Sequence, residues 1–377
     1  MIITKETSPH IRRKATVSRM MIDVLIALAP TLLFSFVVYP LNTLWTYLIS
    51  VFVMVGSEFV YVGLRNMMPK DDQKHSFKER FTYAYKGHFN QNNILTACIS
   101  AVIYTLITPP GAPIYAIIIG ALAGIILGKL VFGGLGSNIF NPAAVGMVFA
   151  KICFGSQYNN NVSTWYYSIP QSALDASAGP TPLGLTNSGY WGNISHYSIT
   201  SLLFGQIPGT LGEVYKITII VGLIYLLIRR SADYRIVAGY LGSFTLLSLV
   251  AGLSIYLIDK SVNPFMFTLY SLLSGGVLFG GTFMLTDPVT SPINSPSRWI
   301  YGMIAAVSTI FIRLFAALPE GVAFSILIAN MFAVVLDHHE WSNPRYTWKK
   351  FLAMGLLFTI PALIIFLVIR FGGIYHV

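Results

Sequence analysis

The feature that most constrains this chain is a series of long apolar runs with almost no charge. The stretch Phe351 to Ile369, for example, contains no charged residue. A helix needs about 20 apolar residues to cross the hydrocarbon core of a bilayer. Backbone groups there must be paired within the chain, and the alternating pattern of barrel strands is absent, so the runs predict helices. Only 10% of the residues are charged, against about 25% in soluble domains. We therefore expect an all-α polytopic membrane protein.

The apolar runs predict ten core transmembrane helices and an eleventh at the C-terminal end. The fifth is short for a complete crossing. The expected bounds are Met21–Tyr39, Leu41–Leu64, Ile94–Ile107, Pro113–Phe132, Pro142–Phe154, Val214–Ile228, Ile236–Ile258, Phe265–Phe279, Trp299–Leu318, Val322–Leu336 and Phe351–Ile369.

The distribution of Lys and Arg predicts the orientation of these spans. Five basic residues precede the first span and six lie between Arg65 and Asn93, and these two segments share one side. That side should be cytoplasmic, so the N-terminus is cytoplasmic as well. The segment Gly155 to Glu213 has no Lys or Arg although the chain carries a net charge of +10, and alternation places it outside. Lys260, which the alternation of spans places outside, is the one mild exception to this distribution of basic residues. The basic excess thus indicates orientation in the lipid membrane, and we expect no nucleic-acid partner.

These predictions divide the chain into five parts. Residues 1–20 form a cytoplasmic tail, 21–154 a first membrane repeat, and 155–213 an extracytoplasmic loop. Residues 214–337 form a second membrane repeat, and 338–377 a cytoplasmic connection with the extra C-terminal helix.

Two similar motifs suggest that the two membrane repeats contain broken helices. Gly133 to Pro142 and Gly280 to Pro288 each begin with a glycine pair and end with Asn-Pro or Asp-Pro. Glycine pairs interrupt helices, and Asn or Asp before Pro favours a helix start. Interrupted helices at matching places indicate a ligand site between two repeats, whereas close helix packing is the alternative. An inverted relation needs an odd number of spans between the motifs. The present assignment leaves four, and half-helices would change that count, so both topologies stay open.

The polar loop contains a short segment, Asp175 to Leu183, in which Thr181 lies between two prolines. Such a turn exposes the threonine hydroxyl. On spacing alone, Thr181 is one more turn residue.

The order of several motifs along the chain resembles the NqrB/RnfD family. This family includes membrane subunits of the Rnf ferredoxin:NAD oxidoreductase and of the sodium-pumping NADH:quinone oxidoreductase. The resemblance covers nearly the whole chain, and its compact N-terminus favours the Rnf type. The matching segments are Ser8-Pro9-His10, Gly133 to Gly146, Asp175 to Leu183, Thr286-Asp287-Pro288, and Pro319-Glu320-Gly321 leading into Ala329-Asn330.

The resemblance implies FMN bound covalently through a phosphoester to Thr181. Family members are modified by a flavin transferase at a motif of the form Asp-x-x-Ser-Gly-Ala-Thr, which Asp175, Gly179 and Thr181 match. Ala178 and Pro180 depart from that motif, which puts the efficiency of the transferase in question. The acceptor hydroxyl and the acidic residue are both retained.

The resemblance also implies a second, noncovalent flavin such as riboflavin near the two glycine motifs. Asn138 and Asn141 would bind the edge of its ring, and Thr286 and Asp287 would complete the site. The alternative is that these residues only cap broken helices. The glycine pairs that open the two motifs, including Gly133 and Gly134, would shape the backbone of the site.

As a member of this family, the chain would be a subunit of an ion-translocating oxidoreductase in a bacterial or archaeal cytoplasmic membrane, active only within its complex. It would carry electrons between ferredoxin and NAD partners, coupled to Na⁺ or H⁺ movement. Its partners would be the ferredoxin- and NAD-side Rnf subunits, a second flavin-carrying subunit and small membrane subunits. The alternatives are the NqrB-type quinone reductase and, from another class, a urea- or ammonium-like channel.

Charged residues inside the spans are the remaining candidates for function, because charge in a membrane is costly. Glu58 is the candidate for ion coupling, with a structural hydrogen bond as the alternative. Lys129, Lys151 and Arg313 are further candidates, and the alternative for the two lysines is that they extend their ammonium groups towards the membrane surface. Asp23 lies too near the start of a helix to be counted as a charge inside a span. We expect Cys98 and Cys153 to be buried thiols, and we predict no metal site and no residue with a catalytic role of its own.

Overall fold

The chain is described by a computed structural model that covers residues 17–67, 77–158, 198–316, 321–338, 341 and 343–372. All regular structure in these residues is helical. The elements are α1 (Val17–Val38), α2 (Pro40–Arg65), α3 (Phe77–Tyr85), α4 (Gln91–Ile107), α5 (Ile114–Gly128), η1 (Leu130–Phe132), α6 (Pro142–Tyr158), α8 (Ile199–Phe204), α9 (Lys216–Arg229), α10 (Tyr234–Tyr256), α11 (Pro264–Leu273), α12 (Val277–Phe279), the π-helix η4 (Gly280–Met284), α13 (Ser295–Phe315), α14 (Val322–Leu336) and α15 (Trp348–Phe371).

The prediction of an all-α polytopic membrane protein is confirmed. Within the described residues, six helices are long and apolar enough to cross a membrane, namely α1, α2, α5 with η1, α10, α13 and α15. The pair formed by α11 and the segment Val277–Met284 is bent by 61°, so this span is broken. A helix lies over most of each span predicted from the sequence, and the shorter ones include α4, α6 and α14.

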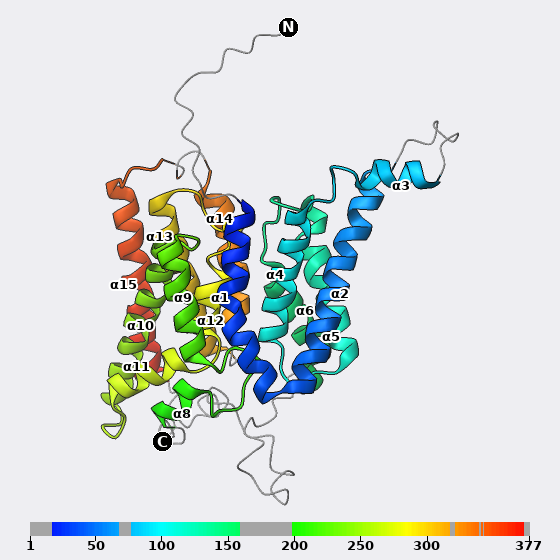
Figure 1. Cartoon of the computed structure of the whole chain (residues 1–377). Coiled ribbons are helices and arrows are strands. Elements are labelled where there is room, and N and C mark those ends of the chain that lie inside the picture. The colour runs from blue at the N-terminus through cyan, green and yellow to red at the C-terminus, as the bar shows by residue number, and fades with distance from the viewer. Residues whose placement is uncertain are drawn as a thin grey trace, which may run out of the picture.

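The helices form two neighbouring groups (Figure 1). Helices α1, α2, α4, α5 and α6 pack on one another, and so do α10, α11, α13, α14 and α15, which α9 and η4 join through contacts with α12, α10 and α14. The groups meet where α1 packs against α9 and where α6 packs against α14. The start of α1 and helix α3 lie at one end of the bundle, and α8 lies at the other (Figure 1).

Glycines allow the backbones of neighbouring helices to approach closely. A Cβ atom at Gly124 of α5 would lie 2.5 Å from the carbonyl oxygen of Pro142. A Cβ at Gly302 of α13 would lie 2.6 Å from the carbonyl oxygen of Ile236 in α10. Lipid tails provide no hydrophobic drive between helices, so close van der Waals contact at small residues has to hold them together.

Asp23, which was not expected to be a functional candidate because it lies near the start of a helix, joins the two groups structurally. Its carboxylate is buried and lies 3.0 Å from a guanidinium nitrogen of Arg229 at the end of α9. It also accepts hydrogen bonds from Tyr225 and Ser231. Both cysteines are free thiols, but neither is buried as expected, because Cys98 is partly exposed and Cys153 is exposed.

Two cations hold the break between α11 and α12. Arg313 donates to the carbonyl oxygens of Ser271 at 2.8 Å and Ser274 at 3.1 Å. Lys216 donates to the carbonyl oxygen of Gly275 at 2.6 Å and to that of Glu213. The last carbonyls of a helix have no partner within it, and their partial negative charge favours cations. The two side chains therefore stabilise a helix end that the bilayer could not solvate.

We expect Arg313→Met to destabilise the fold by about 3 kcal/mol, because carbonyl oxygens of α11 lose a charged donor. The measurement is the thermal unfolding of the full chain in detergent. Arg345→Met is the matched control, because Arg345 is exposed. Equal midpoints for the two variants would show that the break does not depend on Arg313.

Candidate functional site

A cavity of about 420 Å³ lies between the two helix groups, near the start of α1 and the end of α5. It is lined by residues of α1, α4, α9 and η4, and by both predicted motifs. The structure therefore brings Asn138 and Asn141 of the first motif together with Thr286 and Asp287 of the second.

The first motif is a glycine turn that the end of α2 holds in place. Gly133 and Gly134 adopt φ values of 114° and 88°, a region in which a residue with a side chain would be strained. Arg65 donates to the carbonyl oxygen of Gly133 at 2.5 Å. These two glycines shape the turn but do not line the cavity, whereas Gly136 and Asn138 do.

Asn141 caps α6 and links the two motifs. Its side-chain oxygen accepts from the backbone of Ala143 at 3.0 Å and of Ala144 at 3.3 Å. Its side-chain nitrogen donates to the carbonyl oxygen of Met284 in η4 at 3.2 Å. The capping alternative therefore describes part of what Asn141 does.

Asn330 of α14 extends this link. It accepts from the backbone N–H of Asn141 at 3.1 Å and donates to the hydroxyl of Tyr301 at 2.8 Å and to the carbonyl oxygen of Thr290 at 3.4 Å. In the sequence, Asn330 stands out only as part of a matching segment, and no contact was predicted for it. A polar residue in the apolar run of α14 was the available signal.

The second motif is a π-helix followed by a turn. Thr286 donates its hydroxyl to the carbonyl oxygen of Thr282 at 2.6 Å. Asp287 accepts from the backbone of Val289 at 3.2 Å and from Thr290 at 3.3 Å. Burial raises the pKa of the Asp287 carboxyl above its ordinary value, although these hydrogen bonds and the charge of Lys129 act in the opposite direction. π-Helical turns are frequent at functional sites.

Lys129 and Glu58 form a buried ion pair beside the cavity. The ammonium nitrogen of Lys129 lies 3.0 Å from a carboxylate oxygen of Glu58, and the two side chains are 3% and 1% exposed. Lys129 also donates to Thr96 at 2.8 Å, and Asn93 donates to Glu58 at 3.1 Å. For Lys129, the alternative in which the ammonium group extends to the membrane surface is therefore wrong. Glu58 has a charged partner, which the sequence pattern did not reveal.

The cavity is lined by both apolar and polar side chains. Val24, Ile99, Ile103 and Phe283 supply apolar surface, whereas Asn138, Asp287 and Lys129 supply donors and acceptors. Pockets of this size and composition suit small organic ligands and cofactors, with the few polar groups fixing their orientation. Thr181, Asp175 and Gly179 lie outside the described residues, so the attachment of FMN stays a prediction.

Comparisons with known proteins connect this chain to sodium-translocating oxidoreductases. The family model described as the NQR2, RnfD, RnfE family matches residues 4–345. The chain is 36% identical over 246 residues to the B subunit of the Na(+)-translocating NADH-quinone reductase of Ectopseudomonas mendocina (strain ymp). It is 34% identical over 246 residues to the protein of the same name from Pseudomonas aeruginosa (strain UCBPP-PA14), and 35% over 245 residues to that of Chromohalobacter salexigens.

Each of these matches covers 64% of the chain and 57% or 58% of the relative. The chain thus spans less than two thirds of the length of these relatives. The family model, by contrast, matches most of the chain. The chain therefore belongs to the NQR2, RnfD, RnfE family.

Proposed function

We propose that this protein is a membrane subunit of an ion-translocating electron transport complex and carries electrons through bound flavin. The family match over residues 4–345 carries this proposal. The relatives' names describe subunits of a sodium-translocating oxidoreductase. The cavity between the two motifs adds support, because it offers room and polar groups for a flavin ring. A urea- or ammonium-like channel loses support, because none of the relatives named above is one.

Two forms of such a complex are candidates. The names of the relatives favour the quinone reductase, in which NADH would be the electron donor and a quinone the acceptor. The ferredoxin:NAD form of the Rnf type is the second candidate, supported by the order of motifs in the sequence. Membranes with and without this chain distinguish the two by whether NADH:quinone or ferredoxin:NAD activity is lost.

The first proposed flavin is FMN esterified to Thr181, attached by a flavin transferase that recognises Asp175 and Gly179. FMN supplies electron transfer when bound, and the protein supplies attachment and position. The loop that carries Thr181 begins after Tyr158 and ends before α8, and α8 lies at the end of the bundle opposite to α3 (Figure 1). The basic residues favour the α3 end as the cytoplasmic side.

The second proposed flavin, such as riboflavin, occupies the cavity without a covalent bond. Asn138 is the best-placed amide to bind it, because its side-chain nitrogen is held only weakly, by a long contact of 3.4 Å to the carbonyl oxygen of Phe140. Lys129 would favour negative charge on the bound group. Asp287 would contribute a hydrogen-bond acceptor, since its side chain also lines the cavity.

Glu58 remains the candidate for ion coupling, now as part of a pair. The Lys129 ammonium is 3.0 Å from the carboxylate, so a sodium ion that bound Glu58 would have to displace Lys129 or follow its movement. Because Lys129 also lines the cavity, the pair connects the proposed flavin to the proposed ion site.

We expect Thr181→Ala to remove covalent flavin, because the esterified hydroxyl is lost. The measurement is the intact mass of the chain produced together with a flavin transferase, with in-gel flavin fluorescence as a second readout. Thr186→Ala, in the same loop, is the control and should keep the flavin. A native chain that shows no mass beyond its residues would refute this part of the proposal.

We expect Asn138→Leu to weaken noncovalent flavin binding roughly tenfold, because about one or two hydrogen bonds are lost. The flavin released by acid denaturation is quantified by fluorescence, and covalent flavin stays with the precipitate. Ser137→Ala is the matched control, because Ser137 is exposed next to the cavity turn. Unchanged release from Asn138→Leu would place the ligand elsewhere.

We expect Glu58→Gln and Lys129→Met each to destabilise the fold by about 3–5 kcal/mol, because each leaves a buried charge without its partner. The double variant should lose much less than the sum, and thermal unfolding in detergent measures all three. The coupling role has a separate readout, the dependence of electron transfer on Na⁺. A stable double variant that retains this dependence would show that the pair is only structural.

A further inference from the structure

Helix α3 is fixed to the end of α2 by aromatic side chains. The ring of Tyr85 stacks on Phe59 of α2, with centroids 4.4 Å apart and an interplanar angle of 12°. Phe81 lies 4.5 Å from Tyr85, and Phe89 meets Phe59 edge-on at 5.4 Å. A Cβ at Gly63 would lie 2.2 Å from the Tyr85 hydroxyl, so the contact requires glycine there. The helix is therefore held in a defined position.

In this position α3 lies to the side of the bundle. Figure 1 shows α3 projecting sideways from the end of α2, beyond the rest of the bundle. The side chains of α2 that face outwards are apolar and exposed, with Phe52 81%, Val60 54% and Leu64 63% accessible. In a bilayer these side chains face acyl chains. A bilayer around this bundle would therefore place α3 at the level of the lipid headgroups next to α2.

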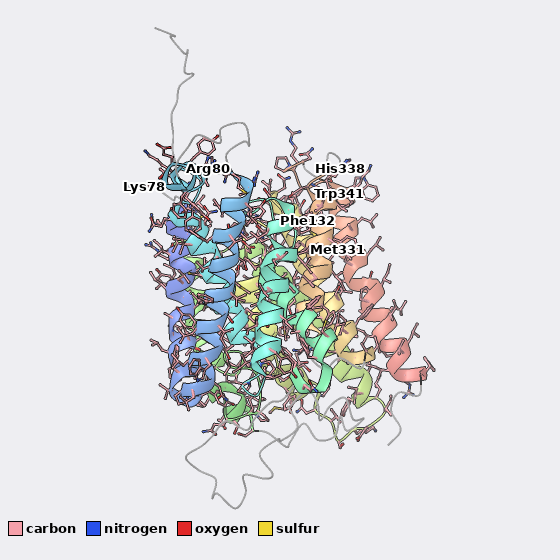
Figure 2. All side chains as sticks on the ribbon, turned by 90° about the vertical axis from the view of Figure 1, so that its right-hand side faces the viewer. Lys78, Arg80, Phe132, Met331, His338 and Trp341 are labelled. Carbon is pink, nitrogen blue, oxygen red and sulfur yellow. The ribbon has the colours of Figure 1, made fainter. Side chains whose placement is uncertain are left out.

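The composition of α3 suits that location. Lys78, Arg80 and the following Lys86 supply positive charge against one acidic residue, Glu79. Lys78 and Lys86 are exposed, and Tyr83 is 51% exposed. Figure 2 shows Lys78 and Arg80 together at the end of the molecule that carries α3. Basic residues combined with aromatic ones are typical of helices that lie in the membrane interface.

We propose that α3 binds the headgroups of anionic phospholipids. Lys78 and Lys86 would attract the headgroup phosphates, and Tyr83 would lie among the headgroups with its ring against the upper acyl chains. The exposed apolar face of α2 continues below α3 and would contact the tails of the same lipids. This continuity favours a lipid over a water-soluble acidic protein, because such a protein would not contact the apolar face of α2.

The test uses the full chain in a neutral detergent, titrated with phosphatidylglycerol while thermal unfolding is followed. Phosphatidylglycerol should raise the midpoint, and phosphatidylcholine or inorganic phosphate at the same concentration should leave it unchanged. For Lys78→Gln/Lys86→Gln the apparent affinity for phosphatidylglycerol should fall roughly fivefold for each lysine removed. High salt should reduce the effect in the unmodified chain.

The control variant is Arg345→Gln/Lys349→Gln, which removes two exposed charges at a distance from α3 in the sequence. It should bind phosphatidylglycerol as the unmodified chain does. The proposal is overturned if both double variants respond alike, or if phosphatidylcholine or inorganic phosphate gives the same shift. It is also overturned if the Lys78/Lys86 variant keeps its lipid response but loses other subunits on purification, because the charges then serve a protein partner.

Discussion

A bilayer offers no water to an interrupted helix, so each break in this protein depends on a donor or acceptor from another helix. At the break between α11 and α12 these donors are Lys216 and Arg313. At the start of α6, Asn141 binds the carbonyl oxygen of Met284, and Asn330 accepts from the Asn141 backbone. Arg65 does the same for the glycine turn before it. Non-helical backbone persists inside the bundle because these contacts supply hydrogen-bond partners to its N–H and carbonyl groups.

The same contacts create the cavity. Because Asn141 ties the start of α6 to η4, the turns on either side of that contact face a common space. Lys129 lines this space, and its positive charge is paired with the carboxylate of Glu58. Two charges 4 Å apart interact by about 4 kcal/mol at an effective dielectric constant of 20. Under the proposed function, an electron in the cavity would therefore compete with Glu58 for Lys129, which links electron arrival to the affinity of Glu58 for a cation.

The spans were predictable because the apolar runs themselves fix them, and the two glycine motifs were predictable as a shared site because their residue types interrupt helices. The ion pair of Glu58 with Lys129 was not predictable. Seventy-one positions separate the two residues, and a lysine near a helix end usually reaches the surface. The burial of Asp23 was missed for the same reason, since its partner Arg229 belongs to α9. The local sequence pattern predicts the individual helices. The ion pairs, in contrast, depend on which helices pack against one another.

The two proposed flavins would lie at opposite ends of α6. Asn141, at the cavity, immediately precedes Pro142, and the helix runs to Tyr158. The residues that follow it, Thr181 among them, lie outside the described part of the chain. Residues 142–154 rise by about 20 Å, which is most of the hydrocarbon thickness. Electrons passing between the two groups would have to cross that distance along the interface of α5, α6 and α14. At Gly124 and Gly146 the backbones of α5 and α6 are in close contact, so the path between the two proposed sites runs through close-packed helices at these positions.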